Sequence, residues 1–295
     1  MKILFTGSNG RFGNIFKNKS KLKNILYPNK KEFNILSLNS LNNYLKKHKP
    51  KIMIHAAGLS RPMEIHEKNI DLSIDKNIIG TCNVVKICRK FGIKLIYLST
   101  NYVYPGKKGN HKETDPLLPY NNYAWSKLGG ECAVQMYKNS LILRVCMTEK
   151  PFIHDSAFTD LITNFIFHED IIGMFPKILK KRGIINIGGK TQSVYNFAKK
   201  FNSKIKGIKA KQFLGKNIPL NHSMNLKKLK NIINDWILDL QKRIFQTEKF
   251  NFITDYEKIL NALKKEVEGR IKGGVGTILE KNQFDQTLNA LALRK

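Results

Sequence analysis

Short runs of apolar residues alternate, over the first half of the chain, with longer segments whose apolar residues recur every three or four positions. The short runs have the length of buried strands, and the longer segments have the period of amphipathic helices. The runs predict strands over residues 2–5, 24–27, 51–54, 94–98 and 140–145. The periodic segments predict helices through residues 15–16 and over 38–48, 69–91 and 123–137. Strands that alternate with helices indicate an α/β fold with a doubly wound parallel sheet.

The pattern is less regular after residue 145, where a strand and turn are predicted over residues 183–189. Further helices are predicted after residues 164–172 and over 193–201, 223–233 (with Asn225 as its N-cap), 254–271 and 283–293. This change divides the chain into residues 1–148, a smaller region at 149–236 that interleaves with the first, and a helical tail at 237–295. The tail carries no evident chemistry, and it is either an oligomerisation helix pair, as in a homodimer, or a small appended module.

A glycine-rich turn follows the first predicted strand, with glycines at positions 7, 10 and 13. Glycines allow a close approach of the backbone to a ligand, and the following helix N-terminus offers free N–H groups to an anion. The turn therefore predicts a dinucleotide pyrophosphate site in a Rossmann-type sheet, although its spacing is Gly-x-x-Gly-x-x-Gly. The expected cofactor-binding residues belong to this turn and to the small-residue segment after the third strand: Gly7, Asn9, Gly10, Arg11, Phe12, Gly13, Ala56, Ala57 and Gly58.

The end of the second predicted strand bears on the choice between NAD and NADP. An NAD site usually has an acidic residue there, on the ribose hydroxyl, whereas a cationic residue suits a 2′-phosphate. Lys30 and Lys31 follow this strand, and Glu32 is the first carboxylate. The sequence therefore favours NADP (NADPH) over NAD, with Lys30 as the phosphate ligand, although in a lysine-rich chain both lysines also fit an ordinary surface.

Tyr123 and Lys127 are four positions apart within a predicted helix, so they share one helix face. A nearby ammonium group favours the phenolate and lowers the pKa of a tyrosine towards the range of a useful proton donor or acceptor. The same spacing also arises by chance as a core aromatic beside a solvated lysine. The pair is a candidate catalytic site only in combination with other motifs.

Composition removes several classes of function. The net charge of +30 would suit a nucleic-acid partner, but the lysines are spread over the whole chain without a compact basic arm, so none is expected. A positive surface would still attract phosphorylated small molecules. No apolar run is long enough to span a membrane, and no signal peptide precedes the first strand. The four cysteines form no Cys-x-x-Cys pair, which predicts buried free thiols and a cytoplasmic location.

The motifs occur in an order that resembles the short-chain dehydrogenase/reductase superfamily, in particular its extended branch that acts on nucleotide sugars. The order is the glycine turn, the segment 56–58, the strand end at 99–100, and Tyr123 with Lys127. The run from residue 99 to residue 131 is similar to that of the dTDP-4-dehydrorhamnose reductases, at positions 99–106, 109, 113–116, 119, 122–123, 126–128 and 130–131. The similarity continues more weakly to about residue 230.

The resemblance implies a role for each matching residue. Tyr123 would donate a proton to the substrate carbonyl, and Lys127 would lower the pKa of Tyr123 and hold the nicotinamide ribose. Thr100 would hydrogen-bond the carbonyl oxygen. Asn77 would match a helix asparagine that supports the lysine through water and so belongs to the cofactor site. The implied substrate is a nucleotide sugar, and no metal is expected.

Departures from related families narrow the reaction. Related dehydratases carry an acidic pair after the threonine, whereas residues 101–102 here are Asn and Tyr, which disfavours elimination. The expected activity is an NAD(P)H-dependent reduction of a 4-keto nucleotide sugar. Two alternatives use the same residues or the same fold: an NAD-dependent nucleotide-sugar epimerase and a non-catalytic, NADP-binding regulatory subunit.

Overall fold

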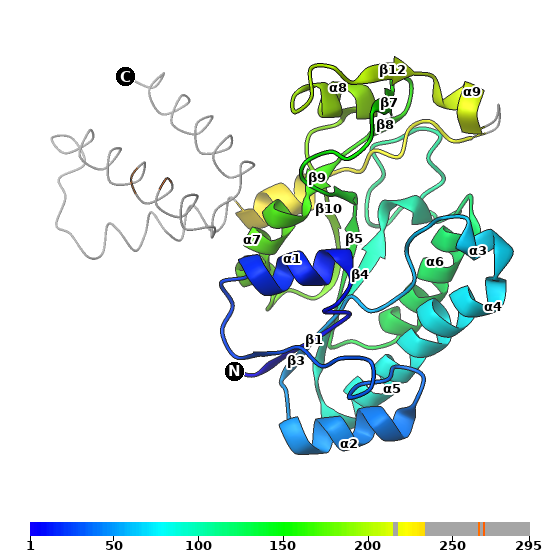
Figure 1. Ribbon diagram of the computed structural model, residues 1–295. Helices are drawn as coiled ribbons and strands as arrows, with labels where there is room; N and C mark the ends of the chain where they lie inside the picture. The colour runs from blue at the N-terminus through cyan, green and yellow to red at the C-terminus, as the bar shows by residue number, and fades with distance from the viewer. Residues whose placement is uncertain (215–217, 234–264, 266–267, 269–295) are drawn as a thin grey trace, which may run out of the picture.

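A parallel sheet of six strands forms the centre of the protein, in the order β10-β5-β4-β3-β1-β2 (Figure 1). The computed structural model describes residues 1–214, 218–233, 265 and 268. The strands are β1 (Ile3–Thr6), β2 (Ile25–Leu26), β3 (Ile52–His55), β4 (Lys94–Thr100), β5 (Ser140–Val145) and β10 (Gly183–Ile187). Because the chain runs outward from β1 in both directions, β1 and β3 flank the point where the strand order reverses. Ligands of open α/β sheets bind at such a point, beyond the carboxyl ends of the strands.

Helices cover both faces of the sheet, which confirms the predicted doubly wound arrangement. Neighbouring strand residues point to opposite faces, so Phe5 enters one hydrophobic core and Leu4 the other. One face is covered by α1 (Arg11–Lys19) and α7 (His168–Ile178), and the other by α2 (Leu38–His48), α5 (Gly80–Phe91) and α6 (Asn122–Gln135) (Figure 1). The apolar period of the sequence identified α2 with its observed bounds.

The segment predicted as one helix over residues 69–91 is divided in the structure. It contains α4 (Ile70–Ser73), the π-helical turn η1 (Ile74–Ile79) and α5, and a short helix, α3 (Ile65–Lys68), precedes it. Asn69 caps α4 by accepting a hydrogen bond from the Leu72 N–H at 2.9 Å. A π-turn holds one more residue per turn than an α-helix, and such turns are frequent at functional sites. The turn contains Asn77, whose side chain is buried.

The helix predicted over residues 223–233 begins later, at residue 227. Met224 pairs with His111 in an isolated bridge, and the Asn225 N–H donates to the His111 carbonyl at 2.8 Å. These contacts hold the first residues of the segment in an extended conformation. The N-cap is Leu226, whose carbonyl accepts from the Lys230 N–H at 2.9 Å, so the prediction of Asn225 as the N-cap is wrong by one residue. Asn225 Oδ1 still accepts from the Lys227 N–H at 3.0 Å, just before the helix. Apart from residues 265 and 268, the predicted tail at 237–295, with its helices at 254–271 and 283–293, lies outside the described residues.

A smaller group of elements packs beyond the main sheet and has its own core around Phe152, Phe167 and Phe197 (Figure 1). It contains β6 (Met147–Thr148), β7 (Ser156–Phe158), β8 (Ile162–Thr163), β9 (Ile166–Phe167), β11 (Gln192–Ser193), α8 (Val194–Lys199), β12 (Lys206–Ile208) and α9 (Ala210–Leu214). Its strands pair as β6-β9, β12-β7 and β11-β8. Since α7 and β10 belong to the main sheet, the region after residue 148 contributes to both cores. The domain boundaries stay a prediction.

The described part of the chain contains no helix that is long and apolar enough to cross a membrane. It also contains no cluster of His, Cys, Asp and Glu that could hold a metal ion. All four cysteines are free thiols. Cys88 and Cys146 are buried, but Cys132 is exposed, so the prediction of buried thiols is correct only for part of the set.

Candidate active site

The glycine turn lies between β1 and α1, where each outer glycine allows a close backbone contact. Gly7 has a φ of +79°, and a Cβ there would lie 2.6 Å from the Ala57 nitrogen. A Cβ on Gly13 would overlap the Gly7 carbonyl oxygen. No side chain caps the N-terminus of α1, so its first N–H groups stay available for an anion. The geometry of the turn therefore suits the pyrophosphate of a dinucleotide, and binding at these residues stays a prediction.

Two adjoining cavities bring most of the predicted site residues together. The larger, of about 470 Å³, is lined by Gly7, Gly10, Arg11, Phe12, Gly13, Ala56, Gly58, Thr100, Tyr123 and Lys127. The smaller, of about 240 Å³, adds Asn9, Lys30 and Ala57. Both cavities share residues of the glycine turn. Their combined size and lining suit an extended ligand that crosses the turn.

Thr100 ends β4, Tyr123 lies in the first turn of α6, and both residues line the larger cavity. Two side chains cap the start of α6: Asn121 Oδ1 accepts from the Ala124 N–H at 2.8 Å, and Glu67 Oε1 accepts from the Asn122 N–H at 3.2 Å. Burial raises the pKa of Tyr123, and a hydrogen bond with the Thr100 side chain lowers it in part. Tyr123 is therefore protonated at neutral pH, as a proton donor has to be.

Lys127 lies one turn further along α6 and is buried, with Nζ 4.2 Å from the centre of the Tyr97 ring. Burial lowers the pKa of Lys127 to about 7. A lysine with this pKa is only partly charged at neutral pH. The charge of Arg61 lowers the pKa of Tyr123 in part, and the expected effect of Lys127 on Tyr123 stays a prediction.

Asn77 lies behind the cavity lining and connects two parts of the site. Its Nδ2 donates to the Leu59 carbonyl at 2.9 Å and to Ser126 Oγ at 2.8 Å, and its Oδ1 accepts from the Leu59 N–H at 2.7 Å. A Cβ on Gly58 would lie 2.7 Å from this Oδ1. Asn77 therefore holds the segment after β3 against the helix that carries Tyr123. The expected contact with Lys127 through water stays a prediction.

Arg61 and Glu149 line the larger cavity but were not among the predicted site residues. Glu149 lies 3.3 Å from Arg11 and 3.4 Å from Arg61, so one carboxylate holds two guanidinium groups. The charge of Arg61 also acts on Tyr102 and Tyr123. Arg61 follows Gly58 by three residues, so the rule that ligands bind beyond the carboxyl ends of strands is the signal that would have found it. The same rule points to Glu149, which follows Val145, the end of β5, by four residues.

Lys76 is a second residue that the sequence did not single out. It lines the smaller cavity together with Lys30, Asn29 and Asn34. Burial lowers the pKa of Lys76, and the nearby charge of Lys30 lowers it further. The two ammonium groups are thus close enough to repel each other, an arrangement that a bound anion would relieve.

Comparison with known proteins identifies the family of the chain. The profile of the RmlD substrate binding domain family matches residues 1–148, which is half of the chain. Methionine adenosyltransferase 2 subunit beta of Pongo abelii is 28% identical over 142 residues. That match covers 45% of this chain and 42% of the relative, so the chain matches less than half of the relative's length.

Solved structures with the same fold cover most of the described chain. A dTDP-4-dehydrorhamnose reductase from Bacillus anthracis str. Ames in complex with NADP has a TM-score of 0.70 at 23% identity, over 78% of this chain and 91% of that one. A dTDP-4-dehydrorhamnose reductase from Clostridium acetobutylicum ATCC 824 has a TM-score of 0.67 at 21% identity, over 76% and 90%. The family resemblance and the fold predicted from the motifs are confirmed, and the chain belongs to the RmlD substrate binding domain family.

Proposed function

We propose that the protein is an NAD(P)H-dependent reductase of a 4-keto nucleotide sugar. The observation that carries this proposal is that Thr100, Tyr123 and Lys127 line one cavity with the glycine turn. Family membership and the fold shared with an NADP-bound reductase support the same class of cofactor. Arg11 and Arg61 add guanidinium groups to this cavity, and guanidinium groups suit the diphosphate of a nucleotide sugar.

The chain's own residues account for the acid side of the reaction. A bound reduced nicotinamide would supply the hydride to the carbonyl carbon of the substrate. The Tyr123 hydroxyl donates its proton to the carbonyl oxygen, and Thr100 donates a hydrogen bond to the same atom. Both groups act where negative charge develops, and so they stabilise the transition state more than the ground state. Lys127, beneath this site, supplies positive charge as the proton leaves Tyr123.

The two residues after Thr100 support reduction over elimination. Asn101 is buried and its Nδ2 donates to the His222 carbonyl at 3.3 Å. Tyr102 presents its ring to Tyr123, with 6.4 Å between the ring centres. Neither position offers a carboxylate that could remove a proton from the sugar carbon beside the carbonyl.

The proposed activity predicts that the purified protein oxidises NADPH or NADH in the presence of dTDP-4-keto-6-deoxy-L-mannose. The loss of absorbance of the reduced cofactor measures this turnover. The same assay with dTDP-, GDP- and UDP-linked keto sugars identifies the nucleotide. Absence of turnover with every member of this set would contradict the proposal.

We propose further that NADPH is preferred, because Lys30 and Lys76 face the smaller cavity, on the side of the glycine turn away from Tyr123. The double substitution Lys30→Ala/Lys76→Ala removes both ammonium groups from the site of a 2′-phosphate. We expect it to raise KM for NADPH by about tenfold, since partly exposed charge pairs contribute little each. KM for NADH should change by less than about twofold, because NADH lacks this phosphate.

Lys31→Ala is the matched control for this prediction. Lys31 neighbours Lys30 in the chain and is exposed, but it does not line the cavity. It therefore removes a nearby positive charge without removing a phosphate ligand. If KM for NADPH rises equally in Lys31→Ala and in the double variant, the effect comes from the overall positive charge of this surface. That result would refute the assignment of Lys30 and Lys76 as ligands of the 2′-phosphate.

The subunit beta relative favours a second candidate, a cofactor-binding subunit of another enzyme. Under this alternative the same cavities bind a dinucleotide, but the protein catalyses no turnover. Stable co-purification with a partner enzyme, together with normal partner activity in the presence of a Tyr123→Phe variant, would favour the subunit over the reductase.

A further inference from the structure

Glu131 is a fully buried carboxylate one helical turn after Lys127 on α6. Its Oε2 accepts a hydrogen bond from Ser99 Oγ at 2.6 Å, and Ser99 precedes Thr100 on β4. Its Oε1 accepts from Arg144 Nε at 3.1 Å and from Arg144 Nη2, in a buried ion pair. The carboxylate therefore connects the strand end that carries Thr100 with the helix that carries Tyr123 and Lys127.

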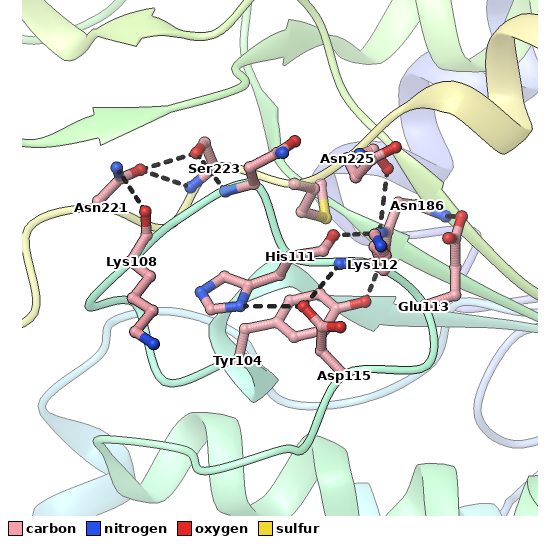
Figure 2. A network of polar contacts seen from close by, with 12 residues as sticks. Tyr104, Lys108, His111, Lys112, Glu113, Asp115, Asn186, Asn221, Ser223 and Asn225 are labelled. Atoms are coloured by element: carbon pink, nitrogen blue, oxygen red, sulfur yellow. Dashed lines mark hydrogen bonds and ion pairs between the residues drawn. The ribbon is translucent and has the colours of Figure 1, made fainter.

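The guanidinium of Arg144 is itself fixed on its other side. Arg144 Nη1 donates to the Tyr104 hydroxyl at 2.7 Å and to the Glu113 carbonyl at 3.1 Å. The Tyr104 hydroxyl donates in turn to Asn186 Oδ1 at 2.8 Å, and Figure 2 shows this phenol pointing at Asn186. A buried ion pair is maintained only when its remaining polar atoms are also satisfied. The remaining polar atoms of this pair have partners, so Glu131 and Arg144 form an ion pair in a fixed position.

Four titratable groups surround Lys127 from the packed elements: His55 on β3, Tyr97 on β4, and Tyr123 and Glu131 on α6. Burial lowers the pKa of His55 to about 3 and raises that of Tyr97 well above its ordinary value, so both are neutral. Tyr123 is neutral as well, because its pKa is raised. Among these groups Glu131 alone is charged, and its charge opposes the effect of burial on the pKa of Lys127.

We propose that Glu131 is a positioning residue for catalysis: its fixed negative charge, one helical turn from Lys127, favours the cationic form of that lysine beneath the reaction site. Arg144 and Ser99 serve this role indirectly, because they hold the Glu131 carboxylate in place. The role rests on the proposed reductase function, in which Lys127 supplies positive charge as the proton leaves Tyr123. It adds a residue outside the cavity lining to the machinery of that reaction.

The substitution Glu131→Gln tests this role because it preserves the shape of the side chain and one acceptor oxygen for Arg144, while the amide NH2 can donate to Ser99 Oγ. Removal of the negative charge, with Arg144 left cationic, favours neutral Lys127. Activity that needs cationic Lys127 is present below the pKa of that residue and is lost as the pH rises through it. We therefore expect the alkaline limb of the kcat profile to move to lower pH by about one unit. An unmoved limb, with activity lower at every pH, would show a merely structural role and overturn the proposal.

Two variants and one measurement without turnover complete the test. Glu131→Asp should return the limb towards its wild-type position, and Glu131→Gln/Arg144→Met, which removes both charges, should move it less than Glu131→Gln alone. NMR titration of lysine side chains, with the Lys127 signal identified by its loss in Lys127→Arg, should show the same shift in the protein without substrate. If the protein turns over no keto sugar, this titration still decides the proposal. Equal Lys127 titration in wild type and in the folded variants would overturn it.

Discussion

Replacement of Tyr123 by phenylalanine is expected to lower kcat for keto-sugar reduction by about 10²- to 10⁴-fold, the usual contribution of a positioned proton donor. The change deletes one oxygen atom at the cavity wall. The raised pKa of Tyr123 means that this oxygen carries a proton at neutral pH, and Thr100 holds it in place by a hydrogen bond. Without it, the growing negative charge on the substrate oxygen keeps only the Thr100 donor. Steady-state kinetics with saturating NADPH measure the loss.

The affinity for NADPH should change little in Tyr123→Phe, because the glycine turn that is expected to hold the pyrophosphate lies at the other side of the sheet's switch point. Fluorescence titration of NADPH provides this measurement. Tyr120→Phe is a matched control, since Tyr120 is a second phenol that lines the same cavity. We expect it to lose far less activity than Tyr123→Phe. An equal loss of kcat in Tyr123→Phe and Tyr120→Phe would show that Tyr123 is not the proton donor.

The order of strands and helices around the sheet followed from the sequence, because burial on both faces leaves a strong apolar signal. The run at 94–98 is of this kind, and the amphipathic period of α2 comes from burial of one helix face. Periodicity does not report where a helix changes its pitch, so the π-turn at η1 was missed inside residues 69–91. Nor does it report pairing between distant segments, which keeps residues 223–226 out of the helix through the contact of Met224 with His111.

Only those parts of the candidate site that belong to local sequence motifs were predicted. The glycine turn, Thr100, Tyr123 and Lys127 belong to local motifs, and the fold brings them to one cavity. Arg61 and Glu149 are 88 residues apart in the sequence and come into contact only in the folded protein. No local sequence spacing predicts this contact. The direction of a pKa shift also depends on burial. Spacing alone indicated that Lys127 would act on Tyr123, whereas burial leaves Lys127 with a pKa of about 7.

The substitution Gly13→Ala is expected to weaken NADPH binding by about 10- to 100-fold and to destabilise the folded protein by about 1–3 kcal/mol. The added Cβ would overlap the Gly7 carbonyl oxygen and would lie 2.7 Å from the Ser8 Cα. Each of these atoms belongs to the backbone, so no side-chain rotation relieves the contact. The turn has to open, and opening moves the N–H groups of the turn and of the α1 N-terminus away from the pyrophosphate site. Fluorescence titration and chemical denaturation measure the two effects.

Gly92→Ala separates this steric effect from the ordinary cost of replacing a glycine. Gly92 ends α5 with a φ of +65°, and a Cβ there would meet no atom within 4 Å. The variant should lose about 1 kcal/mol of stability through the left-handed backbone alone and should bind NADPH like the wild type. Both variants add one methyl group to a glycine. If only Gly13→Ala loses NADPH affinity, the loss is due to the geometry of the turn. Wild-type affinity in Gly13→Ala would instead show that the dinucleotide does not depend on the close packing of α1 against this turn.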